Sequence, residues 1–304
     1  MNRVDRMRTR NRRGEPDTMN HDEIVWQSHK KRVGSGKRVG RVCFTLLLAL
    51  SFALSPLAAL ARPASSLDLT PELDQGLLGE GRAAYRERAN HDRARDAYRI
   101  FKQNLDENPG DPTAAWHLGL ACYFMGMRVV DDSEKARVYA EGRDRAAEGL
   151  ATDPDCGPCH LMTGVNHALW SQEVGIFRTI VGLPSVKRHL RRASELDPSF
   201  GGGAAYRVLA AIYKVLPRMF GGGKKKARRS IEKAIQAAPD EPLNYEVLAE
   251  LMIEEFNDPR GAVAAARRGL MVPQPEPAYV ESLDALEVLE RIVERYGARS
   301  DSGG

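Results

Sequence analysis

Prolines recur along this chain of 304 residues at nearly constant intervals, and this repeat constrains the fold more than any other feature. Pro109, Pro154, Pro198 and Pro239 are separated by 45, 44 and 41 residues. Each follows a segment with apolar residues at a helical spacing, such as FKQNLDEN before the first of them. Because proline ends a helix and helix pairs stack at such periods, the chain is predicted to repeat one helix pair several times.

The residues after these prolines resemble the tetratricopeptide repeat, whose first helix carries an aromatic residue, then Leu-Gly, then a second aromatic residue. Leu118-Gly119 occupies the Leu-Gly pair of one repeat, Gly164 the glycine of the next, and Tyr245 the first aromatic position of a later one. A small residue at that glycine position lets two helices approach closely. The resemblance implies an all-α, tetratricopeptide-like helical-repeat superhelix, with an irregular helical bundle as the alternative.

Helical periodicity predicts the individual elements. A last helix is expected to cap the stack, because a terminal repeat must cover its exposed apolar face. The predicted helices span 71–88 and 92–106, 112–127 and 134–151, 157–172 and 184–196, 203–216 and 224–238, 242–256 and 259–270, and 278–296. The predicted divisions are a basic leader with a signal peptide at 1–61, a linker at 62–70, the helical-repeat domain at 71–296 and a disordered tail at 297–304.

The leader differs from the rest of the chain in charge. Residues 1–61 hold 12 Lys and Arg against 5 Asp and Glu, whereas the remainder holds 33 against 36, so nucleic acid is not an expected partner. The run VCFTLLLALSFALSPLAALA at 42–61 follows the basic stretch, and its small-residue ending is typical of a cleaved secretory signal. We therefore expect an exported, periplasmic protein beginning at Arg62. An uncleaved membrane anchor at 42–61 is the alternative.

Two glycine clusters in the chain resemble one particular family of tetratricopeptide proteins. The stretch LDPSFGGGAAYRVLAAIYKVLPRMFGGGKKKARRSIEKAI at 196–235 is similar to the TatT family, the exported tetratricopeptide component associated with TRAP solute transporters. The likeness extends over about residues 95–260 and implies a trimeric periplasmic protein that handles a ligand with a solute-binding partner. TatT proteins include lipoproteins, whereas Cys43 precedes the apolar run and is not placed for lipid attachment. The residues that carry the likeness are Asp197-Pro198, Gly201-Gly202-Gly203, Leu216-Pro217, Gly221-Gly222-Gly223-Lys224 and Lys226-Ala227.

The second glycine cluster is also interpretable without the family. Gly221 to Gly223 are predicted to end one helix with positive φ angles. GGGKKK lacks the G-x-x-x-x-G-K-[ST] spacing of a phosphate-binding loop. Three adjacent lysines at a helix start oppose the helix dipole, which predicts a solvated loop, with a partner contact as the alternative.

The segment CGPCH at 156–160 is the part of the chain that most suggests chemistry. Cys156, Cys159 and His160 could supply two thioether sulfurs and an axial imidazole to a c-type haem. A thioredoxin-like dithiol would need a preceding strand, and zinc would need about four ligands, and neither pattern is present. The repeat offers a structural alternative, in which the segment forms a turn between repeats and the two cysteines pair or pack. This interpretation is favoured, so no cofactor is expected, with covalent haem c as the alternative.

No catalytic motif is present, so the chain is predicted to be a non-enzymatic binding or scaffold protein. Its expected partners are a periplasmic solute-binding protein or another envelope protein, an apolar small molecule and further copies of the chain. A generic envelope interaction scaffold is the alternative function. The first helices of such a stack line its concave face, where a partner groove is predicted, although some of these positions could be core between helices. The predicted groove residues are Trp116, Leu120, Tyr123, Leu161, Val165 and Tyr206, and the fourth repeat adds Glu246, Glu250 and Ile253.

Overall fold

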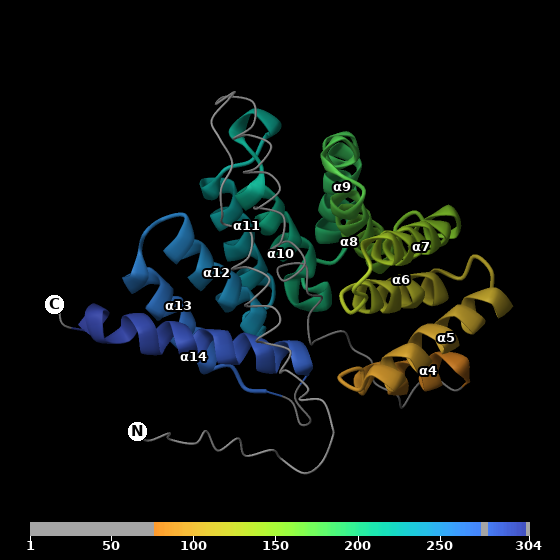
Figure 1. The fold of residues 1–304 in the computed structure, drawn as a ribbon, viewed down its shortest axis with the longest axis horizontal. Helices are drawn as coiled ribbons and strands as arrows, with labels where there is room; N and C mark the ends of the chain where they lie inside the picture. Colours follow the sequence, from red (N-terminus) through yellow and green to blue (C-terminus); the bar gives the residue numbers. More distant parts are fainter. Residues whose placement is uncertain (1–75, 275–278, 302–304) are drawn as a thin grey trace, which may run out of the picture. The chain divides into compact units, whose positions relative to one another are not determined.

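The computed structural model describes residues 76–274 and 279–301. By its contacts the chain divides into the units Met1–Leu46 and Leu47–Gly304, and every described residue belongs to the second. Over these residues the chain forms eleven α-helices and one short 3₁₀ helix, and none of them lies in a β-strand (Figure 1). The predicted leader at 1–61 and linker at 62–70 lie outside the described residues.

The helices follow one another in consecutive pairs, and each packs chiefly against its neighbours in the chain. This nearest-neighbour packing defines a helical repeat and confirms the predicted fold class. The pairs are α4 (Leu77–Arg86) with α5 (His91–Glu107), α6 (Pro112–Gly126) with α7 (Asp132–Thr152), α8 (Gly157–Glu173) with α9 (Ile176–Leu196), α10 (Phe200–Val215) with α11 (Lys224–Ala237), and α12 (Pro242–Glu254) with α13 (Pro259–Leu270). The 3₁₀ helix η1 (Arg218–Phe220) lies between α10 and α11, and α14 (Val280–Asp301) follows the last pair.

The four recurring prolines occupy equivalent turns. Pro109, Pro154, Pro198 and Pro239 lie in the connections from α5 to α6, α7 to α8, α9 to α10 and α11 to α12. Side chains then fix the helix starts: Asp111 accepts hydrogen bonds from two backbone N–H groups in the first turn of α6. The prediction that each proline separates one helix pair from the next is confirmed.

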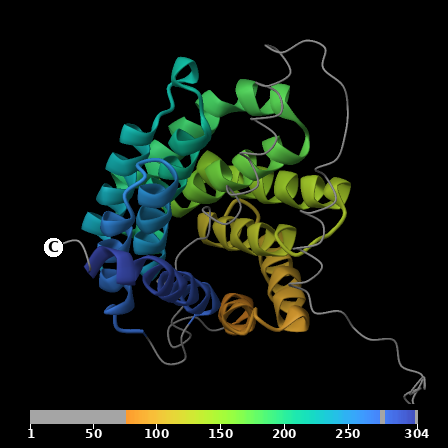
Figure 2. The same ribbon diagram turned by 60° about the vertical axis from the view of Figure 1, so that its left-hand side comes forward.

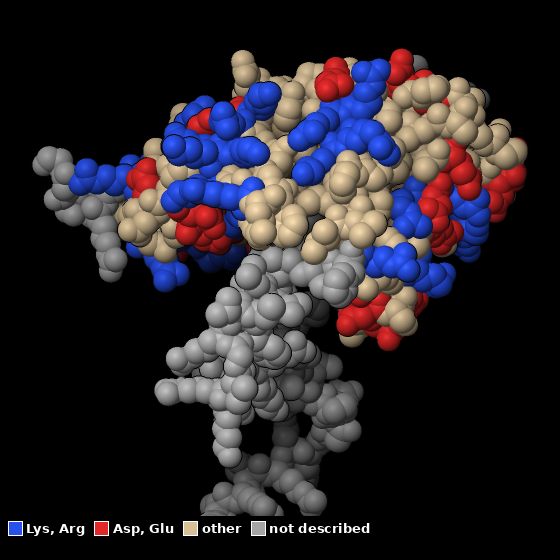
Figure 3. All heavy atoms as spheres, turned by 90° about the horizontal axis from the view of Figure 1, so that it is seen from above, with Lys and Arg blue, Asp and Glu red and all other residues tan. Residues whose placement is uncertain are grey.

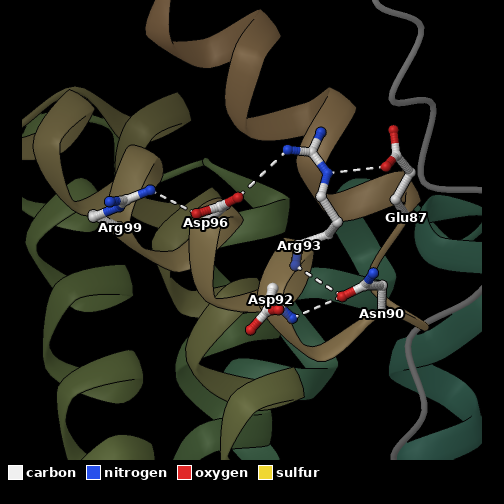
Figure 4. Close-up of polar contacts among 6 residues, drawn as sticks. All are labelled: Glu87, Asn90, Asp92, Arg93, Asp96 and Arg99. Carbon is white, nitrogen blue, oxygen red and sulfur yellow. Dashed lines mark hydrogen bonds and ion pairs between the residues drawn. The ribbon is translucent and has the colours of Figure 1, made fainter.

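The start of α5 shows the same kind of capping (Figure 4). Asn90 accepts hydrogen bonds from two backbone N–H groups of the first turn. Beside it, Arg93 pairs with Glu87 and Asp96, and Asp96 also pairs with Arg99. Since Glu87 and Arg99 are exposed and Arg93 and Asp96 are partly exposed, such ion pairs contribute little to stability. The cap is therefore the main local reason that α5 begins at this point.

Close approach between helices explains the glycines of the repeat pattern. A Cβ atom on Gly119 would lie 2.9 Å from Cβ of Met162 on α8 and 3.1 Å from Cβ of Ala146 on α7. A Cβ atom on Gly164 would lie 3.0 Å from Cγ of Leu190 on α9. These glycines stand where helices of the repeat meet, which is the role predicted for the small residue of the tetratricopeptide pattern.

Two helices extend further than predicted. α9 begins at Ile176 rather than at 184 and contains Pro184 in its interior. Proline removes the donor that would bond the carbonyl of Ile180, but both residues are exposed, so water can satisfy that carbonyl. At the other end α14 continues to Asp301, so residues 297–301 of the predicted tail are helical, and 302–304 lie outside the described residues.

The last helix contacts both the final repeat and the first one. α14 packs along α12 and α13, which is the capping role predicted for it. Its first turn also reaches the connection between α4 and α5, where Arg88 Nε donates a hydrogen bond of 2.9 Å to Oε1 of Glu281. Arg88 Nη2 bonds the second carboxylate oxygen, and both side chains are 4% exposed. Figures 1 and 2 both show the end of the blue α14 beside the orange α4.

Candidate functional site

The CGPCH segment forms the turn that enters α8. Cys156 is the N-cap residue of that helix, and its sulfur accepts a hydrogen bond of 3.1 Å from the backbone N–H of Cys159. The two sulfurs are joined in a disulfide, and the residues are 8% and 0% exposed. Each sulfur that a covalent haem would need is therefore bonded to the other. Attachment of haem c to these cysteines and His160 stays a prediction.

His160 connects α8 to the following helix. Its Nε2 lies 3.0 Å from the carbonyl oxygen of Pro154, and its Nδ1 lies 2.9 Å from Nδ1 of His189 on α9. Both contacts are satisfied when His160 donates from Nε2 and His189 donates from Nδ1. Burial, with smaller effects from His160 and Arg188, lowers the pKa of His189 to about 4. His189 is therefore neutral near pH 7, and the histidine pair packs as a polar bridge between the two helices.

The residues predicted to line a groove lie mostly in the hydrophobic core. Tyr206 is partly exposed, and its hydroxyl lies 3.4 Å from the carbonyl oxygen of Ser194. The face of α6 that the repeat pattern assigns to the groove is instead enclosed, and α6 contacts α8 directly. This agrees with the alternative that these positions form core between helices. The exposed fractions are 8% for Trp116, 0% for Leu120 and Tyr123, 1% for Leu161 and 2% for Val165.

An open cavity of about 700 Å³ lies between α12 and α14. Two of the residues that the fourth repeat was predicted to contribute, Glu250 and Ile253, line it, whereas Glu246 is buried. A mixed lining of this kind suits a polypeptide segment or an apolar molecule with polar ends. Its apolar and aromatic residues are Ile253, Val288, Ile292 and Tyr296, and its charged residues are Glu250, Glu254, Glu294, Arg291 and Arg295.

A buried arginine organises the first glycine cluster. Gly201, Gly202 and Gly203 have φ angles of 60°, 61° and 76°, in the left-handed region that glycine enters most easily. Arg207, which is fully buried, donates to the carbonyl oxygens of Gly202 and Gly201 at 2.9 and 3.3 Å. It also donates to Oδ1 of Asn244 on α12 at 2.7 Å. The sequence prediction missed this tie, although an arginine within the apolar run AAYRVLAAI is a signal for it.

The second glycine cluster forms the tight connection between η1 and α11. Gly221 and Gly223 have φ angles of 85° and 130°, as predicted, whereas Gly222 is not among the residues with positive φ. Glycine is required at position 222 for another reason, because a Cβ atom there would lie 1.9 Å from the carbonyl oxygen of Leu216. The cluster therefore combines positive φ angles with a close backbone approach.

Other reactive groups in the described part of the chain are enclosed or dispersed. Cys122 is a free thiol inside the core, and its burial raises its pKa well above the usual value, which makes it unreactive. Across residues 76–274 and 279–301, no group of three or more His, Cys, Asp or Glu side chains is placed to hold a metal ion. None of the helices described there is long and apolar enough to cross a membrane.

Stacked helix pairs, close-approach glycines and a capping helix define a tetratricopeptide-like helical-repeat fold. Residues 78–201 match the protein family described as regulator of microtubule dynamics protein 1-3. The crystal structure of a thermophilic tetratricopeptide-repeat protein from Thermus thermophilus is similar, with a TM-score of 0.53 and 18% identity. That match covers 72% of this chain and 99% of the other, and it shows the fold alone. No curated protein matches the chain in sequence.

Proposed function

We propose that this protein is a non-enzymatic, exported binding scaffold that works with a TRAP-type solute uptake system. The fold class supports the scaffold role, since helical repeats offer extended surfaces to partners. The likeness of the two glycine clusters to the TatT family supports the link to solute uptake. The observation that carries the proposal is the cavity between α12 and α14, which presents apolar and charged side chains together on a packed helical array.

The cavity has the chemistry of a partner-binding site. Partly exposed Ile253 offers apolar contact, while Arg295 can orient an acidic group. The carboxylates of Glu254 and Glu294 can orient a basic one. The proposed occupant is a segment of the periplasmic solute-binding protein, with an apolar small molecule as a further ligand. Because α14 forms one wall, its packing on α12 and α13 holds the cavity in shape.

Titration calorimetry with the solute-binding protein of the TRAP system from the same genome tests this proposal. Ile253→Arg places a cation on the apolar lining, and we expect it to weaken binding by at least about tenfold, the loss typical of truncating or disrupting an anchor residue. Met271→Arg is the matched control, because Met271 is 82% exposed and does not line the cavity. If the wild-type chain does not bind, the TRAP link is wrong. Equal binding by Ile253→Arg would place the contact on another surface.

Export is tested separately by the intact mass of the protein isolated from its native compartment. A mass that begins at Arg62 supports cleavage and a periplasmic protein, whereas retention of 42–61 in the membrane fraction supports the anchored alternative. An added mass of one porphyrin on a form lacking the Cys156–Cys159 disulfide would support covalent haem instead.

A further inference from the structure

Four cationic side chains from two neighbouring repeats lie close to Tyr213 or to the second glycine cluster. We name Lys187 and Arg191 of α9, Arg218 of η1 and Lys226 of α11 the basic edge. Arg191 Nη2 donates a hydrogen bond of 3.2 Å to the hydroxyl of Tyr213, and Nζ of Lys226 lies 6.0 Å from the centre of the same ring. The basic edge thus joins α9 to the connection between α10 and α11.

Gly221 lies at the centre of this arrangement. Lys226 Nζ donates a hydrogen bond of 2.9 Å to the carbonyl oxygen of Gly221. Nζ of Lys187 lies 3.8 Å from the position that a Cβ atom on Gly221 would take. The second glycine cluster therefore brings cations of α9 and α11 to the same place.

Within the described residues, the cations of the basic edge have no carboxylate partners, since no Asp or Glu oxygen lies within ion-pair distance of any of the four. Glu195 follows Arg191 by one turn but pairs with Arg192. Some nearby cations are matched, since Arg192 also pairs with Asp155, Arg228 with Glu232, and Lys214 with Glu254. Others extend the basic edge, because Arg188 donates to the hydroxyl of Ser185 and Lys224 to the backbone carbonyl of Glu255.

Uncompensated charge of this kind costs stability in the isolated protein. Lys187 and Arg191 are four residues apart on one helix, a spacing at which like charges repel. The view from above shows Lys and Arg side chains gathered in the middle of the molecule's upper face (Figure 3). An anionic surface would relieve the repulsion along the whole edge at once.

Bulky apolar side chains protrude from α9 and η1, the elements that carry three of these cations. Val181, two turns before Arg188 on the exposed side of α9, and Met219 of η1 are each 79% exposed. Ile180 and Phe220 next to them are 38% and 39% exposed. The two apolar pairs stand on separate turns and project outward.

We propose that the basic edge docks on an anionic membrane surface. Its cations would contact lipid phosphates, while Val181 and Met219 enter the interfacial layer, the combination that holds a protein on a bilayer without spanning it. An acidic polypeptide would neutralise the cations but would leave these protruding side chains in water. The bilayer accounts for both features. This inference is independent of the proposed role in solute uptake.

A dye that reports its surroundings at single positions tests the proposal in the full chain. Cys43→Ser removes the one cysteine outside the described residues, while Cys122 is buried and Cys156 and Cys159 are paired. In that background an environment-sensitive dye is attached to Met219→Cys or, as the matched control, to Met271→Cys. Both methionines are highly exposed, at 79% and 82%. The vesicles are phosphatidylcholine, with or without an equal part of phosphatidylglycerol.

We expect the dye at 219 to shift to shorter wavelength on phosphatidylglycerol vesicles, and the dye at 271 to remain unchanged. Each Lys or Arg contributes roughly fivefold to binding an anionic surface, so K187E/R191E/K226E should weaken binding by about 100-fold or more. R95E/R99E/R137E makes the same charge change at exposed positions on α5 and α7 and should have little effect.

Four outcomes would overturn the proposal. The dye at 219 could fail to respond to phosphatidylglycerol, or the dye at 271 could respond equally. The charge change on α5 and α7 could weaken binding as much as the change on the basic edge. The fourth outcome is protection of the dye at 219 by soluble polyglutamate but not by vesicles, which would assign the basic edge to an acidic protein partner. Thermal melting of each variant, followed by circular dichroism, confirms that the helices remain folded.

Discussion

Replacing Glu281 with glutamine tests whether the last helix is tied to the first repeat. The carboxylate of Glu281 receives two hydrogen bonds from Arg88, a residue 193 positions earlier in the chain. Glutamine keeps the size of the side chain but loses its charge, and its amide group would oppose one N–H group of the guanidinium. The substitution therefore leaves a buried cation without its counter-charge.

The structure sets the size of the expected effect. Removing one partner of a buried ion pair costs about 3–5 kcal/mol. Arg88 keeps two other contacts, a hydrogen bond of 3.0 Å to the carbonyl of Tyr85 and a position 4.5 Å above the ring of that tyrosine. These contacts favour the lower end of the range, about 3 kcal/mol. Since α14 also packs on α12 and α13, part of the loss should appear as local opening of its first turn.

Urea unfolding, together with hydrogen exchange over residues 280–286, measures both parts. A double-mutant cycle with Arg88→Met separates the interaction energy of the pair from the contacts that each side chain makes with its surroundings. The double replacement Arg88→Met with Glu281→Leu should recover most of the lost free energy of unfolding, because no buried charge remains. The reasoning fails if Glu281→Gln changes the free energy of unfolding by less than about 1 kcal/mol, the scale of an exposed pair. It also fails if exchange in the first turn of α14 is unchanged.

Three further predictions concern packing, pH and the disulfide. Gly119→Ala should lower the free energy of unfolding by about 1–3 kcal/mol because its Cβ would meet another Cβ at 2.9 Å, whereas Gly157→Ala, with 3.4 Å of clearance, should cost much less in the same urea titration. Burial lowers the pKa of His117 to about 3, so the folded state excludes a proton that the unfolded chain binds below its usual pKa of about 6.5. Stability should therefore be complete above that pH and fall by up to about 1.4 kcal/mol per pH unit toward pH 3, and unfolding titrations of His117→Gln should show a shallower slope. Cys156→Ser with Cys159→Ser opens a very short loop, so thermal melting should show a loss of only about 2 kcal/mol.

The repeat could be predicted from the sequence because its signals are local. Pro109 and its three equivalents stop helices wherever they occur, and Gly119 permits a close approach that a larger residue would block. Pro184 shows where such a local rule fails. It is exposed within α9, so the missing hydrogen bond costs less than ending the helix and losing the packing of Val186 and Leu190. Tertiary packing then overrides the intrinsic preference of proline.

The candidate site was harder to predict because periodicity identifies an apolar face without showing what covers it. Leu120 and Leu161 fall on the face expected to line a groove, but neighbouring helices bury both. Ile253 belongs to the same face in a later repeat and lines the open cavity beside α14. The difference depends on where α14 lies, and α14 is not part of the repeating pattern.

Ion pairs also differ in whether the sequence predicts them, because some join residues close in the chain and others join distant ones. Arg228 and Glu232 are four residues apart on α11, so their pairing follows from the spacing of a helix. The repulsion between Lys187 and Arg191 is visible in the sequence for the same reason. The tie between Arg88 and Glu281 has no such signal, because neither residue belongs to the repeat pattern and nearly the whole domain separates them. A local pattern can therefore show where charge accumulates on one helix. Only the folded chain shows which of those charges form ion pairs and which have no ion-pair partner.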